Sequence, residues 1–376
     1  MTKSIEDNLS DRLHQELTNS FIDKKISLLS RGLKQDVVLN TEVSNDDKVL
    51  IDGQCIGELK GLKFDIELTA KTLDTDIKSI KKAARKGIHD ELSKRVLKII
   101  EEEKVSLEED NKIYWKKNPI ARIKRGKNYL SPYIEIISDD ALSESSREEL
   151  DIFLKEWLSK FINEELHDLL NLTKVKIENQ YLRDLFFQIY ENNGVMKRSE
   201  AETIIKLIPK EERKKLWDMG IKLGRYHIYL PKMLKPKAVK LRINLWKLHN
   251  EDYSTEHIPQ FGLNFIVNNK KNKKFLLLCG FENFKDFFVR VDILEKLFIN
   301  ILEKTKNRKF TVNSAMMNLL GCSKENFYKL MTLMDYKKDK DKDTYVFGGD
   351  RKKNTKIFKN GSISNPFNKL LSLNIK

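Results

Sequence analysis

The strongest constraint on the fold of this chain is a stretch in which two prolines separate a strand pattern from a helix pattern. Residues 225–230 are rich in aromatic and β-branched side chains, which is typical of a short strand. Pro231 ends that strand, because proline cannot donate to a sheet ladder. Pro236 stands where a first helical turn tolerates proline, and an apolar repeat continues to Leu248. The sequence therefore predicts a strand–proline–helix unit over 220–248.

Basic and aromatic residues are dense in this unit, and they predict a surface for a polyanion. Cations neutralise phosphates and release counterions, while aromatic rings stack on unpaired bases. We expect the nucleic-acid-binding residues of this unit to be Arg225, Tyr229, Lys235, Lys237 and Arg242.

Two further clusters have the same character. One lies on a helix predicted over 74–103, whose buried side is formed by Ile77, Ile80, Ala84, Ile88, Leu92, Val96 and Ile99. Its exposed side carries Lys78, Lys81, Lys82, Arg85 and Lys86, and we expect Lys78, Lys82, Arg85 and Lys86 to bind nucleic acid. The other lies around a basic hairpin tip at 125–128 and comprises Trp115, Arg122, Arg125 and Lys127. For each cluster the alternative is a solvated face that contacts nothing.

The net charge agrees with a polyanionic partner. The 376 residues include 71 Lys and Arg against 56 Asp and Glu, a net charge of +15, and the pI is about 9.3. Such a balance favours nucleic acid. The alternative is compositional bias, since lysine-rich proteomes encoded by AT-rich genomes reach this charge without a function.

Cysteine usage and hydropathy indicate the cellular setting. The three cysteines are far apart and form no Cys-x-x-Cys pair, so neither a zinc site nor a disulfide framework is indicated. The polar amino terminus argues against a secretory signal, and no apolar run is long enough to span a bilayer. We expect a cytoplasmic protein with no membrane partner.

The apolar spacing predicts an α+β chain, mainly helical and multidomain, with small antiparallel β units. Helices are expected over 5–35, 74–103, 143–170, 175–193, 199–208, 209–220 and 291–304. A small β unit is expected over 37–68, two strands over 112–137, and two short strands over 261–280. The predicted segments are 1–36, 37–140, 141–250 and 251–376.

The last segment contains two predicted short helices over 311–335, with Ser323 as the cap of the second. The pair resembles a helix-turn-helix, and the alternative is a structural helical hairpin. The residues expected in the core of that hairpin are Phe327, Leu330, Met331, Leu333 and Met334. The chain from 336 onward predicts a basic wing or hairpin, followed by a polar tail.

Several segments resemble, in the same order, a region of a known enzyme family. They are 17–29, 49–64, 118–123, 220–246, 289–297 and 314–323. They are similar to the region C-terminal to the motor core of bacterial superfamily 2 ATP-dependent RNA helicases, which are related to the RNA helicase of the mitochondrial degradosome. This resemblance implies a non-catalytic region that guides single-stranded or structured RNA, with DNA as the other candidate.

The chain carries no motor of its own. An ATPase of this class needs a Gly-x-x-x-x-Gly-Lys-Ser/Thr loop to hold the phosphates, and the sequence has none. We therefore expect no catalytic residue, no metal and no cofactor, with ATP bound only if another chain supplies a motor core. A split gene or a truncated copy would explain that arrangement. The alternative function is a protein–protein adaptor that docks on a separate helicase or nuclease.

Overall fold

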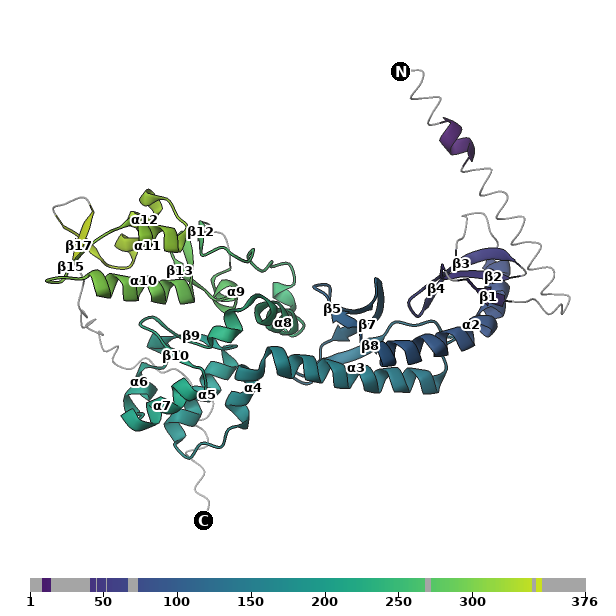
Figure 1. Ribbon diagram of the computed structural model, residues 1–376, viewed down its shortest axis with the longest axis horizontal. Coiled ribbons are helices and arrows are strands. Elements are labelled where there is room, and N and C mark those ends of the chain that lie inside the picture. The colour runs from purple at the N-terminus through teal and green to yellow at the C-terminus, as the bar shows by residue number, and fades with distance from the viewer. Residues whose placement is uncertain are drawn as a thin grey trace, which may run out of the picture. The chain divides into compact units, whose positions relative to one another are not determined.

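A computed structural model of the chain describes residues 9–14, 41–44, 46–51, 53–66, 74–267, 272–339 and 343–346 (Figure 1). Within these ranges, the side chains of 54, 74–83 and 86 are not described. The chain is α+β and mainly helical, with several small antiparallel sheets, as the sequence predicts. It forms two compact units, which are 1–261 with 272–280, and 262–271 with 281–376. Of the helix predicted over 5–35, only 9–14 lie among the described residues, and these are helical.

The first unit begins with a four-stranded meander beside a long helix. Its strands pair in the order β1 (Thr41–Val43), β2 (Lys48–Ile51), β3 (Gln54–Lys60) and β4 (Lys63–Ile66), and they pack on α2 (Asp74–Glu102). The predicted β unit and helix are therefore confirmed. The predicted buried stripe of α2 is confirmed over Ala84, Ile88, Leu92, Val96 and Ile99, all of which are inaccessible to solvent.

A second antiparallel sheet follows α2. Its strands are β5 (Val105–Leu107), β6 (Lys112–Trp115), β7 (Asn118–Lys124) and β8 (Tyr133–Ile136). The prediction of two strands over 112–137 is wrong, because β6, β7 and β8 all lie there. The missed turn between β6 and β7 contains Lys116, whose φ is 56°. Lysine at a left-handed position gives none of the glycine signal by which a tight hairpin is usually predicted.

Helix α3 (Glu144–Glu165) runs alongside α2 and contacts β8 (Figure 1). The predicted helix over 143–170 divides at Leu166, which leaves helical geometry with a φ of −110°, and α4 (His167–Lys174) continues beyond it. No proline or glycine marks this break in the sequence. The elements that follow are α5 (Gln180–Glu191), β9 (Val195–Lys197), η1 (Arg198–Glu200), α6 (Glu202–Leu207) and α7 (Lys210–Asp218).

The predicted strand–proline–helix unit is confirmed. It consists of β11 (His227–Tyr229), the 3-10 turn η2 (Pro231–Leu234) and α8 (Pro236–Lys247). Strand β11 lies between β10 (Lys222–Leu223) and β9, with antiparallel pairing on both sides. One hydrophobic core extends from Val49 to Leu245. The predicted segments 37–140 and 141–250 therefore share a core and are not separate domains.

The first unit is completed by a segment that was predicted as a strand. After η3 (Glu251–Tyr253), residues 273–278 form a helix, α9 (Lys273–Leu278). The Asn272 side chain caps it by accepting hydrogen bonds from the backbone N–H groups of Lys274 and Phe275, at 3.1 and 3.2 Å. A short apolar run fits a buried strand or a buried helix equally well, and here the asparagine cap favours the helix.

The second unit contains a three-stranded sheet and a helical module. The sheet consists of β12 (Phe265–Val267), β14 (Phe287–Arg290) and β13 (Phe281–Phe284), in that spatial order. The module runs through α10 (Val291–Lys304), β15 (Lys309–Thr311), α11 (Ser314–Leu320), α12 (Lys324–Leu333), β16 (Lys337–Lys338) and β17 (Thr344–Val346). Its sheet order, β15-β17-β16, together with this succession is that of a winged helix-turn-helix.

The predicted details of this module are confirmed. The Ser323 hydroxyl caps α12 by accepting a hydrogen bond from the Asn326 backbone N–H at 3.3 Å. Gly321 ends α11 in the left-handed conformation, with a φ of 68°. Of the predicted core of the helix pair, Phe327, Leu330 and Met331 are buried, whereas Leu333 and Met334 are only partly buried.

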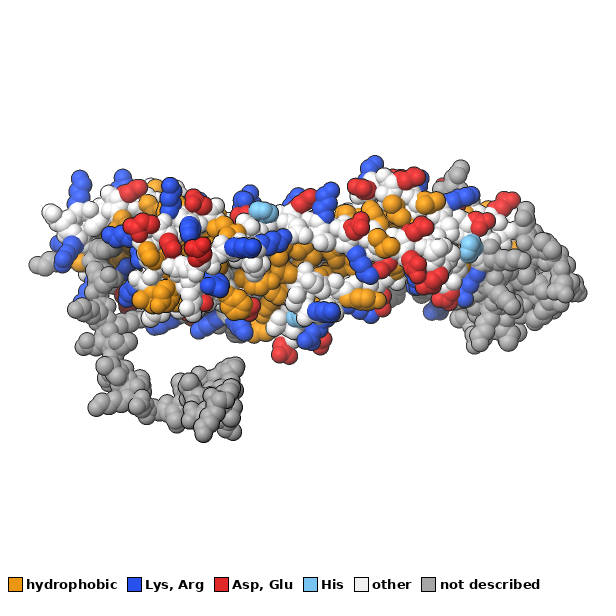
Figure 2. Space-filling view, turned by 90° about the horizontal axis from the view of Figure 1, so that it is seen from below, with side chains coloured by type: hydrophobic (Ala, Val, Ile, Leu, Met, Phe, Trp, Pro, Cys, Tyr) orange, Lys and Arg blue, Asp and Glu red, His pale blue; other side chains and the backbone are white. Residues whose placement is uncertain are grey.

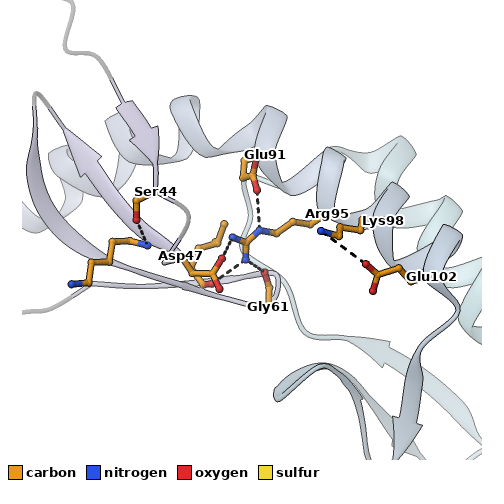
Figure 3. Close-up of polar contacts among 9 residues, drawn as sticks. Ser44, Asp47, Gly61, Glu91, Arg95, Lys98 and Glu102 are labelled. Atoms are coloured by element: carbon orange, nitrogen blue, oxygen red, sulfur yellow. Dashed lines mark hydrogen bonds and ion pairs between the residues drawn. The ribbon is translucent and has the colours of Figure 1, made fainter.

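Most basic side chains of the chain lie at the surface, and on the face shown in Figure 2 they are interspersed with acidic ones. Arg95 is an exception, because only 8% of its side chain is exposed. Its Nη1 donates to the carbonyl oxygens of Leu59 and Gly61, each at 3.1 Å, and its Nε donates to Glu91 at 3.2 Å (Figure 3). Its Nη2 pairs with Asp47. This one guanidinium therefore ties the first sheet to α2.

Replacing Arg95 with methionine should destabilise the first unit. The change leaves the two buried carbonyls without a donor, and each orphaned group costs about 1–3 kcal/mol. All four tryptophans lie in the first unit, so urea unfolding followed by tryptophan fluorescence measures the effect there. Lys98→Met is the matched control, since Lys98 is exposed and, among the described residues, pairs with Glu102 alone, at 3.9 Å. Equal unfolding free energies for the two variants would contradict this role of Arg95.

Candidate nucleic-acid interface

The second sheet has one buried face and one exposed basic face. Ile113, Trp115, Ile123 and Ile134 point into the core. The alternate residues point outward because strand side chains alternate between faces. They include the following residues of β6, β7 and β8: Lys112, Tyr114, Arg122, Lys124, Tyr133 and Glu135. Arg122 pairs in register with Lys112 on one side and with Glu135 on the other.

Ion pairing with acidic side chains decides which of these cations can bind a phosphate group. Lys112 pairs with Asp110 at 2.9 Å, and Lys124 pairs with Glu135 at 2.6 Å. Arg122 is exposed and has no acidic partner among the described residues. The same holds for Arg125 and Lys127 in the connection between β7 and β8. These three predicted residues therefore form a group of available cations, which we call the β7 cations because they lie on β7 or just beyond its end.

An acidic group flanks this surface. Although burial opposes it, hydrogen bonds from Lys112 and Tyr114 lower the pKa of Asp110, so this carboxylate stays ionised. The Tyr114 hydroxyl donates to Asp110 at 2.9 Å, and that hydrogen bond raises the pKa of the tyrosine. The ring of Tyr114 is consequently held beside the basic face.

Trp115, the aromatic residue predicted to bind nucleic acid here, does not lie on this face. Trp115 is only 4% exposed and belongs to the core, so the prediction that it stacks on a base is wrong. The Lys116 ammonium lies 4.3 Å from the centre of its ring. Tyr133, which is 57% exposed and opposite Lys124 in register, takes the outward position instead. The alternation of Tyr133 and Glu135 with two isoleucines could have indicated this from the sequence.

In the predicted cluster on α2, Arg85 is the one residue whose side chain is described, and it is not a free cation. The Arg85 Nε donates to Asp139 at 2.8 Å, and its Nη2 contacts Asp140 at 2.9 Å. Arg85 therefore fastens the 139–140 turn to α2. Lys78, Lys82 and Lys86 belong to the same helix, but their side chains lie outside the described residues.

The strand–proline–helix unit divides its predicted residues between surface and core. Arg225, Lys235 and Lys237 are exposed. Tyr229 is 8% exposed and Arg242 is fully buried, so the prediction that these two bind nucleic acid is wrong. Tyr229 lies on the central strand of its sheet, and α8 is covered on most of its circumference.

Arg242 is instead a buried cation with little compensation. Its Nε donates to the Met233 carbonyl at 3.2 Å, but Nη1 and Nη2 have no hydrogen-bond partner among the described residues. Burial lowers the pKa of Arg242 to about 10, and Cys279 and Tyr129 oppose this only in part. At neutral pH, below this pKa, the guanidinium remains charged, so the folded state bears the desolvation cost.

Other classes of site are not found in the part of the chain that the structure describes. No group of histidine, cysteine, aspartate or glutamate side chains there could hold a metal ion. No described helix has both the length and the apolar character needed to cross a membrane. Comparisons of the chain with protein-family models, curated proteins and solved structures gave no match.

Replacing Arg242 with methionine should leave RNA affinity unchanged, because no part of this side chain reaches the surface. The free energy of unfolding should equal that of the wild type or exceed it by up to about 4 kcal/mol, since an unpaired buried charge is replaced by a hydrophobic side chain. Fluorescence-monitored urea unfolding and RNA titration measure the two quantities. Lys237→Met, at an exposed position of the same helix, serves as the stability control. Weaker RNA binding by the folded Arg242 variant would contradict its assignment to the core.

Proposed function

We propose that this chain is a non-catalytic, cytoplasmic nucleic-acid-binding region of a helicase-like protein. It binds single-stranded RNA on the outer face of the second sheet. The observation that carries the proposal is that Arg122, Arg125 and Lys127 are exposed, have no acidic partner in the described part of the chain, and are close in sequence to the exposed ring of Tyr133.

The chemistry of this face favours an unpaired strand. Single-strand binding surfaces combine cations that follow the backbone with aromatic rings on which bases stack. Tyr133 supplies such a ring, and the β7 cations supply the charges. A paired duplex keeps its bases stacked inside and would leave the ring unused. The preference for RNA over DNA follows from the resemblance to RNA helicases.

The resemblance also suggests how the region is used. These 376 residues contain no phosphate-binding loop, so any ATP-driven movement would be supplied by a motor core outside them. The chain would then hold or guide the RNA for that motor or for a nuclease.

Replacing Arg122, Arg125 and Lys127 together with alanine should weaken RNA binding and reduce its salt dependence. Each lost phosphate contact on a single strand lowers the slope of log K against log salt by about 0.7, so the three together lower it by about 2. Fluorescence anisotropy with a labelled single-stranded RNA at several salt concentrations measures this slope.

The matched control is the triple alanine variant of Lys98, Lys155 and Lys206. It removes the same total charge, but each of these lysines already pairs with an acid four residues away. Equal losses of slope in the two triple variants would mean that net charge, and not this surface, drives binding. Co-purification of a helicase or nuclease that survives nuclease treatment, without RNA binding by the chain, would favour the adaptor function.

A further inference from the structure

Helix α7 exposes a tryptophan that the sheet surface does not involve. Trp217 is 63% exposed, whereas Trp115 and Trp246 are at most 9% exposed and Trp157 is half-buried. A tryptophan presents a large apolar ring, and leaving most of it in water forgoes the stabilisation of burial. This exposure therefore points to a ligand for the ring.

Lysines occupy the same side of the helix. Residues four and seven positions apart on a helix share a face, so Lys210, Lys214 and Trp217 form one stripe. Leu216, next to Trp217 in sequence, is fully buried, so a different side of α7 packs into the core. The stripe consequently faces solvent.

The end of α7 adds a third lysine to this stripe. Gly220, with a φ of 75°, closes the helix by donating to the Trp217 carbonyl at 2.9 Å, and the Ile221 N–H donates to the Leu216 carbonyl at 2.9 Å. This closure is typical of a helix end formed around a left-handed glycine. It returns the chain into β10, where the Lys222 ammonium lies 4.7 Å from the centre of the Trp217 ring.

The charges of the stripe are available to a ligand. Lys210, Lys214 and Lys222 are exposed, and none has an acidic partner among the described residues. Lysines elsewhere in the first unit are often neutralised by a nearby acid, as Lys155 is by Asp151. An exposed aromatic ring beside unpaired cations matches the chemistry of an unpaired nucleotide, which offers a base to stack and a phosphate to neutralise. An apolar protein partner would use the ring but not the three charges.

We propose that Trp217 is a stacking platform for an unpaired base of single-stranded RNA, with Lys210, Lys214 and Lys222 neutralising the flanking phosphates. This inference rests on the proposed function and adds a second contact region to it. The ring supplies affinity that does not depend on salt, and the lysines supply the part that does.

The first test compares affinities of the full chain for an oligouridine RNA. Trp217→Ala should weaken binding by roughly 5- to 150-fold, the range expected for the loss of one stacked base. Its salt slope should stay as in the wild type, whereas Lys222→Ala should lower the slope. Trp217→Phe should retain most of the affinity. Phe187→Ala is the matched control, because Phe187 is 60% exposed in the same unit, and it should change nothing.

The second test uses the ring itself as the reporter. Bound oligouridine should quench the tryptophan fluorescence of the wild type and should not quench that of the Trp217→Phe variant. RNA binding by the wild type without quenching, and with equal affinity for Trp217→Ala, would overturn the platform while leaving the proposed function standing. Absence of any RNA binding by the wild type would overturn both.

Discussion

The packing of the apolar stripe of α2 is the interaction on which the first unit depends. Ala84, Ile88, Leu92, Val96 and Ile99 exclude water completely, and the first sheet packs directly against this helix. Arg95 reinforces the contact by donating to two carbonyls at the turn between β3 and β4. Helix α3 packs alongside α2, and β8 packs on α3. The outward direction of the second sheet's basic face thus follows from how α2 is buried.

The distinction that matters for function is between a paired cation and an available one. A net charge of +15 says little by itself, because many of these cations already have a partner. Arg85 pairs with two aspartates, Arg95 binds carbonyls and acidic side chains, and Arg242 is buried in the core. The β7 cations and the lysines of the α7 stripe have no acidic partner among the described residues, and each group lies near an exposed aromatic ring. Charge and stacking surface coincide at these two places, which is why we propose both as contacts for single-stranded RNA.

Periodicity in the sequence was enough to predict the strongly patterned elements. The buried side of α2, the end of α5 before Gly194 and the Ser323 cap follow from local rules of spacing and capping. The failures share a different cause, which is tertiary context. In the sequence, Arg242 and Tyr229 look like surface residues. The fold shows that α8 is covered on most of its circumference and that β11 is the central strand of its sheet. Trp217 and Leu216 are neighbours in the sequence, and only the fold shows that the tryptophan is exposed while the leucine is buried. The β7 cations could be chosen from the sequence, but the sequence does not reveal that they lack acidic partners among the described residues.

The most direct test of the account is a titration of the purified chain with labelled single-stranded RNA at two salt concentrations, with duplex DNA of the same length for comparison. If the two surfaces bind single-stranded RNA, the single strand should bind saturably and more weakly as salt rises, and the duplex should bind with lower affinity. Absence of binding to the single strand at low salt would contradict this proposal, and would reduce the positive charge of the chain to a feature of composition.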